Sequence, residues 1–159
     1  MTVGNIDSTE KGSGARYNDG KPDYSLLILR DFAGYLSLYN SGTPIDIIHQ
    51  LGMFQQTGDI DFLENALTEA GMDAIEESCY VLTYGAKKYA THNWIKGMAW
   101  SVPLACAVRH SLAILNGEEY DSESGQRHLA HVVCNVFMLI HYAKHYKEGN
   151  DLPPKEYFN

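Results

Sequence analysis

In the second half of the chain, most of the histidines lie near a short basic stretch and a cluster of four acids, a composition suited to binding a metal ion and phosphate. Six of the seven histidines lie between His92 and His145, and 78–117 carries basic residues but no acidic one. Carboxylates and imidazoles can hold a divalent cation, while ammonium and guanidinium groups bind phosphate oxygens. Solvated faces whose charge alternates by chance would give the same pattern, so charge alone leaves both interpretations open. The basic residues are Lys87, Lys88, Lys96 and Arg109, and the acids that follow are Glu118, Glu119, Asp121 and Glu123.

The first of three helices expected to position these groups covers 73–89. Asp73 is its expected N-cap, with an acid three residues further on, as in a capping box. At about 100° per residue, Glu77 and Lys88 fall on one stripe, about three turns apart. Lys87 and Lys88 are equally explained as cations that stabilise a helix C-terminus. The stripe therefore predicts either part of a site or an ordinary helix end.

The second helix is expected over 101–116, with Pro103 in its first turn and Gly117 after its end. It is apolar on nearly every side, which predicts a central, buried helix. Arg109 and His110 are its conspicuous polar residues. A buried guanidinium needs a partner, which would be either a carboxylate in a structural ion pair or a phosphorylated ligand.

The third helix is expected over 124–147 and carries a polar stripe opposite its apolar face. His128, His131 and Asn135 lie within about 60° of arc on this stripe. Histidines at positions i and i+3 project in nearly the same direction, so both can reach one ion or one phosphate. The alternative is that His128 and His131 are ordinary surface or structural histidines without a ligand.

The whole chain is predicted to be one all-α domain, an antiparallel helix bundle with few strand residues. We expect an irregular N-terminal arm over 1–22, a helical insert over 23–73, core helices that carry the site over 74–147, and a tail over 148–159.

Composition excludes several classes of protein. The chain has 159 residues, 45% of them hydrophobic, and a net charge of −8, which argues against binding nucleic acid through overall charge. No uninterrupted apolar run reaches the length of a membrane span, and 1–17 has no apolar signal core. Cys79, Cys106 and Cys134 are far apart in apolar surroundings, as buried, reduced thiols would be. We expect a cytoplasmic protein with no membrane or nucleic-acid partner.

Several short motifs, taken together and in order, resemble a phage family of dATP/dGTP diphosphohydrolases, which is similar to the MazG-type all-α nucleotide pyrophosphohydrolases. The motifs are Arg-Tyr-Asn-Asp-Gly-Lys-Pro at 16–22, Leu-Thr-Tyr-Gly-Ala-Lys-Lys-Tyr at 82–89, Asn93-Trp94, Arg109-His110, Gly117-Glu118 with Asp121, and Ser124-Gly125 with His128, His131 and Asn135. The resemblance covers roughly 1–30 and 74–147. It implies an oligomeric, MazG-like enzyme that uses Mg²⁺ or Mn²⁺ to cleave dGTP or dATP to the monophosphate and pyrophosphate, in the host cytoplasm if the protein is phage-encoded.

The chain departs from this pattern at three places. The downstream acidic pair of the MazG relatives corresponds best to Glu118 and Asp121, which here lie at a helix–helix junction and not in mid-helix. The segment 31–72 is longer than the usual connection between the matched blocks. MazG relatives commonly carry two adjacent glutamates and a third one turn later, whereas here Glu76 and Glu77 are followed by Tyr80.

The motifs and the chemistry of phosphate cleavage together suggest a role for each candidate residue. Glu77, Glu118 and Asp121 are the expected metal carboxylates, and His128 and His131 are either ligands or residues that orient them. The expected substrate contacts are Arg16, Asn18, Lys21, Lys87, Lys88, Asn93, Trp94, Arg109 and Asn135, with Asn93 and Trp94 at the base or sugar. His110 is expected as a proton carrier or as a structural partner of the acids.

Two other functions stay open at this point. One is a metal-dependent nucleotide phosphohydrolase that releases triphosphate. The other is a nucleotide-binding protein without catalysis, which the departure at Tyr80 favours.

Overall fold

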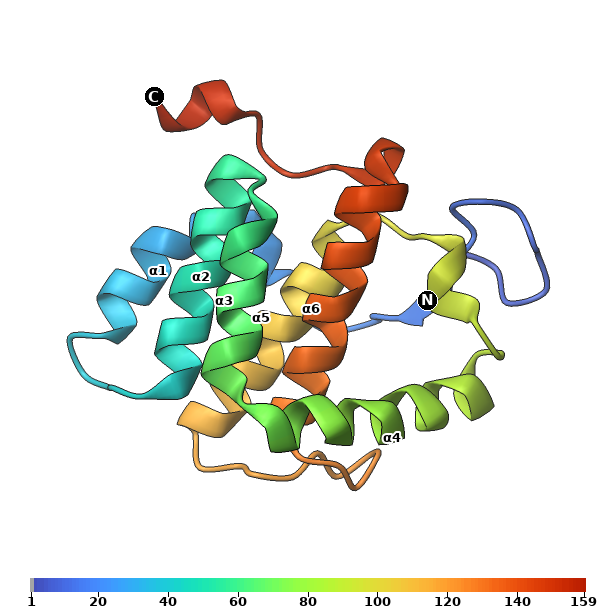
Figure 1. Ribbon diagram of the computed structural model, residues 1–159, viewed down its shortest axis with the longest axis horizontal. Helices are drawn as coiled ribbons and strands as arrows, with labels where there is room; N and C mark the ends of the chain where they lie inside the picture. The colour runs from blue at the N-terminus through green and yellow to red at the C-terminus, as the bar shows by residue number, and fades with distance from the viewer. Residues whose placement is uncertain (1) are drawn as a thin grey trace.

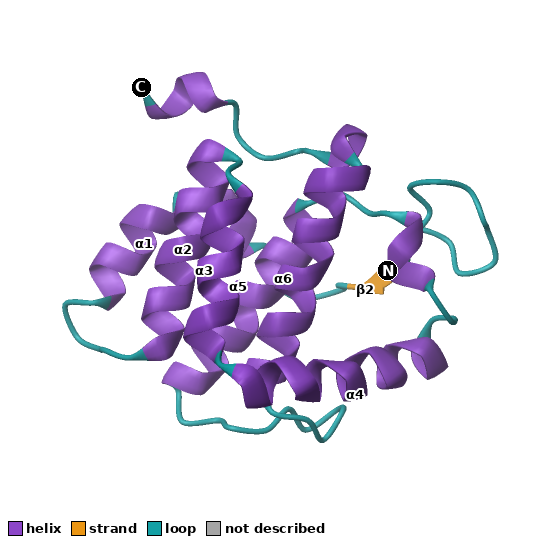
Figure 2. Cartoon of the chain, in the orientation of Figure 1, coloured by secondary structure: helices purple, strands orange, loops and turns teal. Residues whose placement is uncertain are grey.

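The computed structural model describes residues 2–159, and the chain is almost entirely helical (Figure 1, Figure 2). The α-helices are α1 (Leu29–Leu36), α2 (Thr43–Thr57), α3 (Ile60–Ala70), α4 (Met72–Lys88), α5 (Ser101–Leu115) and α6 (His128–His145). Short 3-10 helices are η1 (Tyr24–Leu26), η2 (Asn93–Lys96), η3 (Lys147–Gly149) and η4 (Lys155–Phe158). Strands β1 (Thr2–Val3) and β2 (Arg16–Tyr17) pair antiparallel. The predicted all-α fold is confirmed.

Helix α4 crosses the other helices instead of running beside them. Figure 1 shows α2, α3, α5 and α6 side by side, with α4 lying across their ends and packing on α6. The single residue between α3 and α4 is Gly71, whose φ of 90° is open to glycine but strained for other residues. This turn redirects the chain sharply. Gly71 also occupies the N-cap position expected for Asp73, which instead lies in the first turn, where an acid favours the helix dipole.

The residues expected as an insert contribute to the same core as the later helices. Helices α2 and α3 pack against α5 and α6, and the ring of Phe54 stacks on Trp100 with centroids 6.0 Å apart. Among residues 2–159, no helix is long and apolar enough to cross a membrane. Fully buried core residues from both parts of the chain are Ile47, Leu51, Phe54, Leu63, Leu104, Val108 and Leu139.

Helix α6 begins at His128, four residues later than the apolar pattern predicts. The preceding segment 117–127, here named the acidic loop, is closed by an antiparallel bridge between Tyr120 and Arg127. The backbone N–H of Asp121 donates to the carbonyl of Gln126 at 2.8 Å. Gly125, with a φ of 77°, supplies the left-handed turn within the loop. These local bonds replace the helical ones, so the acids lie on a structured loop.

Two of the three cysteines are buried as predicted, and the third is not. Cys106 and Cys134 lie in the interior, and burial raises the pKa of the Cys134 thiol to about 11. Cys79 is exposed on α4, because this helix packs through Ala74, Ser78 and Val81 instead of the face that carries Cys79. The expectation of three buried thiols was therefore wrong for Cys79.

Because α2 shares the common core, Phe54→Ala should destabilise the whole chain. The cavity and the lost burial should lower the free energy of unfolding by about 3–5 kcal/mol. Denaturant unfolding followed by circular dichroism should still show one transition. Tyr39→Ala is the matched control, since Tyr39 is 86% exposed and its removal should change stability by no more than about 0.5 kcal/mol. Separate transitions for 23–73 and for the later helices would contradict the shared core.

Candidate active site

A cavity of about 680 Å³ lies where the arm, α4, η2, α5, the acidic loop and α6 meet. Its volume is in the range of small-molecule sites. Most of the predicted site residues line it, whereas Glu77, Asn18 and Lys87 do not. The predicted residues that line the cavity are Arg16, Lys21, Lys88, Asn93, Trp94, Arg109, His110, Glu118, Asp121, His128, His131 and Asn135.

Two guanidinium groups meet at one side of this cavity. Arg16 Nη1 donates to Asn135 Oδ1 at 3.2 Å and to Cys106 Sγ at 3.3 Å, and its Nη2 donates to Met138 Sδ at 3.1 Å. Arg109 Nη2 lies 3.7 Å from the same Cys106 sulfur. Within residues 2–159, neither arginine forms an ion pair with a carboxylate.

This arrangement leaves a local excess of positive charge. Lys21 adds a third cation to the cavity, and burial together with Arg109 lowers the pKa of its ammonium group. Sulfur is only a weak hydrogen-bond acceptor and an amide oxygen is neutral, so the bonds of Arg16 do not cancel its charge. Partly buried cations without a carboxylate favour an anionic ligand, and phosphate suits the planar donor set of arginine.

Three histidines form a compact group beside these cations. His110 Nδ1 and His128 Nδ1 are 2.8 Å apart, and the His110 ring stacks on His131 with centroids 4.3 Å apart. His128 Nε2 lies 3.7 Å from Glu118 Oε2, and His131 Nε2 lies 3.4 Å from Asp121 Oδ2. Each of the two acids predicted on the loop therefore faces one histidine of α6.

Two histidines of this group, His110 and His131, are held neutral by burial. Burial lowers the pKa of His131 to about 4, and burial and the neighbouring His131 lower the pKa of His110 much further. The contact between the Nδ1 atoms of His110 and His128 holds one proton. If His110 donates it, His128 keeps its proton on Nε2, facing Glu118, and His110 Nε2 is left as an acceptor at the cavity.

Ser124, which the sequence analysis did not include among the site residues, organises the other end of the group. Its backbone N–H donates to Asp121 Oδ2 at 2.9 Å, and its Oγ lies 2.6 Å from His131 Nε2. Although burial opposes it, the hydrogen bonds that Ser124 donates to the Asp121 carboxylate hold the pKa of Asp121 below its usual value. Asp121 is thus a fixed, ionised carboxylate, and only the tertiary fold reveals this role of Ser124.

No group of three or more His, Cys, Asp or Glu side chains in the described part of the chain is arranged to hold a metal ion. The cavity nevertheless offers suitable donors, because the carboxylates of Glu118 and Asp121 and the neutral imidazoles are all metal ligands. The protein alone thus supplies pairs of donors in place of a preformed cage.

The polar residues on one stripe of α4 form two separate ion pairs with the acidic loop. Glu77 Oε2 accepts from Arg127 Nε at 2.7 Å, an ion pair that ties the base of the acidic loop to α4 outside the cavity. Lys88 Nζ pairs with Glu123 Oε1 at 2.5 Å. Lys87 is exposed and does not line the cavity. Glu77 and Lys88, predicted on one stripe, therefore each form an ion pair that attaches the acidic loop to α4.

Aromatic rings surround the Lys88 ammonium group. The ring centroids of Tyr17, Tyr84 and Tyr89 lie 5.9, 5.8 and 5.4 Å from Lys88 Nζ, within the range of cation–π contacts. Lys88 therefore joins the arm, α4 and the acidic loop. The spacing of Tyr84 and Lys88, four residues apart on a helix, is the sequence signal that could have included Tyr84.

The remaining predicted contacts have structural partners. The Asn93 amide bonds to the backbone of Ala15, and Asn18 Oδ1 lies 3.9 Å from Cys106 Sγ. Trp94 lines the cavity and packs edge-on against His141, with centroids 5.2 Å apart.

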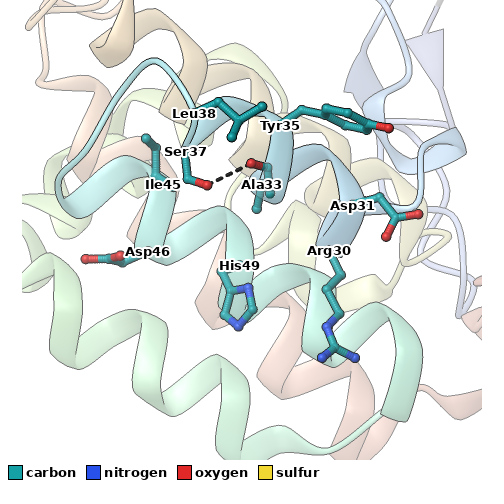
Figure 3. A pocket seen from close by; sticks show the side chains of 10 residues that line it. Arg30, Asp31, Ala33, Tyr35, Ser37, Leu38, Ile45, Asp46 and His49 are labelled. Carbon is teal, nitrogen blue, oxygen red and sulfur yellow. Dashed lines mark hydrogen bonds between the residues drawn. The ribbon is translucent and has the colours of Figure 1, made fainter.

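A second hollow, about 740 Å³ in volume, lies on the outer face of α1 and α2 (Figure 3). In Figure 3 the carboxylates of Asp31 and Asp46 point away from each other, and Ser37 bonds within its own helix, to the carbonyl of Gly34. No predicted site residue lines it. Its polar groups do not converge, in contrast to those of the first cavity.

An all-α chain that gathers unpaired guanidinium groups beside a carboxylate–histidine group has the features of a protein that acts on phosphorylated small molecules. The family model described as dATP/dGTP diphosphohydrolase, N-terminal, matches residues 54–152, and the chain belongs to this family. It is therefore an enzyme of the nucleoside triphosphate pyrophosphohydrolase class. No curated protein and no solved structure matches the chain. The matched residues include α3 to α6 and the acidic loop, while the arm lies outside them.

Because Glu77 pairs with Arg127 outside the cavity, Glu77→Gln should have a small effect on the reaction. A partly exposed ion pair contributes about 0–1 kcal/mol, so both stability and turnover of dATP and dGTP should change only a few-fold. Steady-state kinetics beside Arg127→Gln, the matched control for the same pair, measures this. A loss of turnover as large as that of Asp121→Asn would show that Glu77 acts directly in the reaction.

Proposed function

We propose that the enzyme hydrolyses a purine deoxynucleoside triphosphate, dGTP or dATP, to the monophosphate and pyrophosphate with the help of Mg²⁺ or Mn²⁺. The observation that supports this most directly is the convergence of Arg16 and Arg109 on Cys106, with no carboxylate partner for either among the described residues. Together with Lys21 they form a cationic side suited to a triphosphate. Asp121 and Glu118 form an acidic side on the same cavity.

The cation would be held by Asp121 and Glu118, with His131 and His128 as further ligands or as residues that orient the carboxylates. Mg²⁺ commonly takes one or two carboxylates from the protein and fills its other positions with substrate phosphates and water. The two carboxylates at the cavity, with no preformed group of three donors in the described part of the chain, agree with this mode of Mg²⁺ binding. When bound, the cation supplies positive charge at the phosphates and lowers the pKa of a bound water.

In the reaction, water oxygen bonds to the α-phosphorus while the bond from that phosphorus to the α,β-bridging oxygen breaks. Negative charge then builds up on the departing pyrophosphate. Arg16, Arg109 and Lys21 would bind these phosphates, and donors fixed in advance stabilise developing charge most effectively. His110 Nε2, in the tautomer that pairs His128 with Glu118, would accept a hydrogen bond from the attacking water and orient it.

Product identification tests this proposal. The purified protein is incubated with a panel of ribo- and deoxynucleoside triphosphates with Mg²⁺ or Mn²⁺, and the products are separated by anion-exchange chromatography. We expect dGMP or dAMP together with pyrophosphate, and no turnover in excess chelator. Release of nucleoside and triphosphate would place the cleavage at another bond. Tight binding of every nucleotide without turnover would indicate a binding protein and would overturn the proposal.

Asp121→Asn should abolish most of the turnover and leave the fold intact. The amide retains an oxygen that can accept from Ser124 N–H but lacks the negative charge that holds the cation. We expect kcat to fall about a hundredfold or more. Nucleotide affinity measured by calorimetry without metal should change little, and the thermal midpoint serves as the control for folding. Full metal-dependent activity in both Asp121→Asn and Glu118→Gln would show that these acids are only a solvated loop.

A further inference from the structure

The N-terminal arm is joined to the segment that follows α4 by a set of close contacts, here named the arm seam (residues 12–15 against 93–97). Asn93 Oδ1 accepts from the backbone N–H of Ala15 at 2.9 Å, and Asn93 Nδ2 donates to the Ala15 carbonyl at 2.7 Å. Both residues are buried. The two bonds from one amide fix the Ala15 backbone in the way that a β-bridge partner would.

The residue just before Ala15 in the arm must be a glycine for this contact to form. Gly14 N–H donates to the carbonyl of Gly97 at 2.8 Å. A Cβ atom on Gly14 would lie 2.7 Å from the Gly97 carbonyl oxygen and 3.2 Å from that of Asn93. Both neighbours are backbone atoms, so any side chain at this position would push the arm away.

The outer part of the arm has its own attachment. Lys96 Nζ donates to the carbonyls of Asn5 and Ser8 at 3.0 and 2.8 Å, and Gly12 N–H donates to the Lys96 carbonyl at 2.6 Å. The arm is therefore fixed along its length to the segment after α4 and does not depend on the short β1–β2 pairing alone.

Arg16 follows Ala15 directly, so the arm seam sets where its side chain begins. At the other end, Asn135 Oδ1 accepts from the guanidinium group, and Asn135 Nδ2 is held by the carbonyl of His131 at 2.8 Å. One asparagine thus fixes the backbone before Arg16 and another fixes its tip. A side chain as long as arginine needs both restraints to keep one conformation.

We infer that Asn93 is a positioning residue for phosphate binding and acts through Arg16. Its amide is engaged with Ala15, which accounts for it better than the contact with base or sugar expected from the sequence. The arm seam places the Arg16 guanidinium beside Arg109, and the cationic side of the cavity is incomplete without the arm. This inference rests on the proposed role of Arg16 in binding the phosphates.

A double-mutant cycle on the full chain tests this coupling. The variants are Arg16→Met, Asn93→Ala and the double variant, and the measurement is the Kd of a non-hydrolysable α,β-methylene analogue of dGTP by calorimetry. Arg16→Met should weaken binding about ten- to hundredfold, as expected for a lost charge-assisted hydrogen bond. Asn93→Ala should weaken it about tenfold alone and by less than about twofold in the Arg16→Met background. In steady-state kinetics, Asn93→Ala should raise KM far more than it lowers kcat.

Gln55 provides a matched control for the loss of a buried amide. Gln55 Oε1 accepts from Leu29 N–H at 2.9 Å, and its Nε2 donates to the carbonyl of Leu27 at 2.7 Å, so it fastens a segment to α2 as Asn93 fastens the arm. Gln55→Ala should lower the thermal midpoint about as much as Asn93→Ala and leave the Kd unchanged. Gly14→Ala breaks the arm seam through backbone contacts and leaves the Asn93 side chain unchanged, so it should show the same coupling to Arg16→Met even if Asn93→Ala folds poorly.

The possible results separate this inference from the proposed function. If Asn93→Ala and Gly14→Ala weaken binding equally with and without Arg16, the arm seam does not act through Arg16 and the inference is wrong, while the phosphate role of Arg16 stands. If Arg16→Met leaves the Kd unchanged, both the inference and the proposed phosphate-binding role of Arg16 fail.

Discussion

The structure depends most on helix α6, which is buried on nearly every side and yet carries polar side chains that are buried with it. His128, His131 and Asn135 are each less than 10% exposed, and every such group needs a hydrogen-bond partner. The partners come from three directions: His110 from α5, the carboxylates from the acidic loop, and Arg16 from the arm. In the described part of the chain, no buried side-chain nitrogen or oxygen lacks a partner. The elements around the cavity thus supply the hydrogen-bond partners that the buried polar side chains of α6 require.

Sequence patterns predicted the helices where local signals act, and were less accurate where the direction of the chain depends on one residue. Helix α5 was predicted closely, because Pro103 opens it and a glycine follows it. The start of α6 was misplaced, since the bonds within the acidic loop compete with helical ones and periodicity does not register them. The crossing of α4 depends on the backbone angle of Gly71, and the face that α4 buries follows from that crossing.

The candidate site shows the same division. Spacing along one helix predicted that His128, His131 and Asn135 face the same way, because such spacing fixes the direction of side chains. Arg109 and His110 were candidates because they are polar residues on an otherwise apolar helix. Partnerships between distant segments could not be predicted in this way. Glu77 and Lys88 share a stripe as expected, but the path of the acidic loop gives each a different partner. The roles of Ser124 and Asn93 depend on backbone atoms of other segments, which residue types do not encode.

The acceptors around Arg16 have a further consequence for how the site can work. Cys106 and Met138 present sulfur atoms, which are polarisable and large enough to hold a guanidinium group in one place but carry no formal charge. An aspartate in place of Cys106 would hold Arg16 and Arg109 more firmly and would also satisfy them permanently, so that a nucleotide would have to displace an internal anion. Neutral sulfur acceptors thus hold the Arg16 guanidinium group in place without neutralising it, so the positive charges of Arg16 and Arg109 remain available to attract an anion.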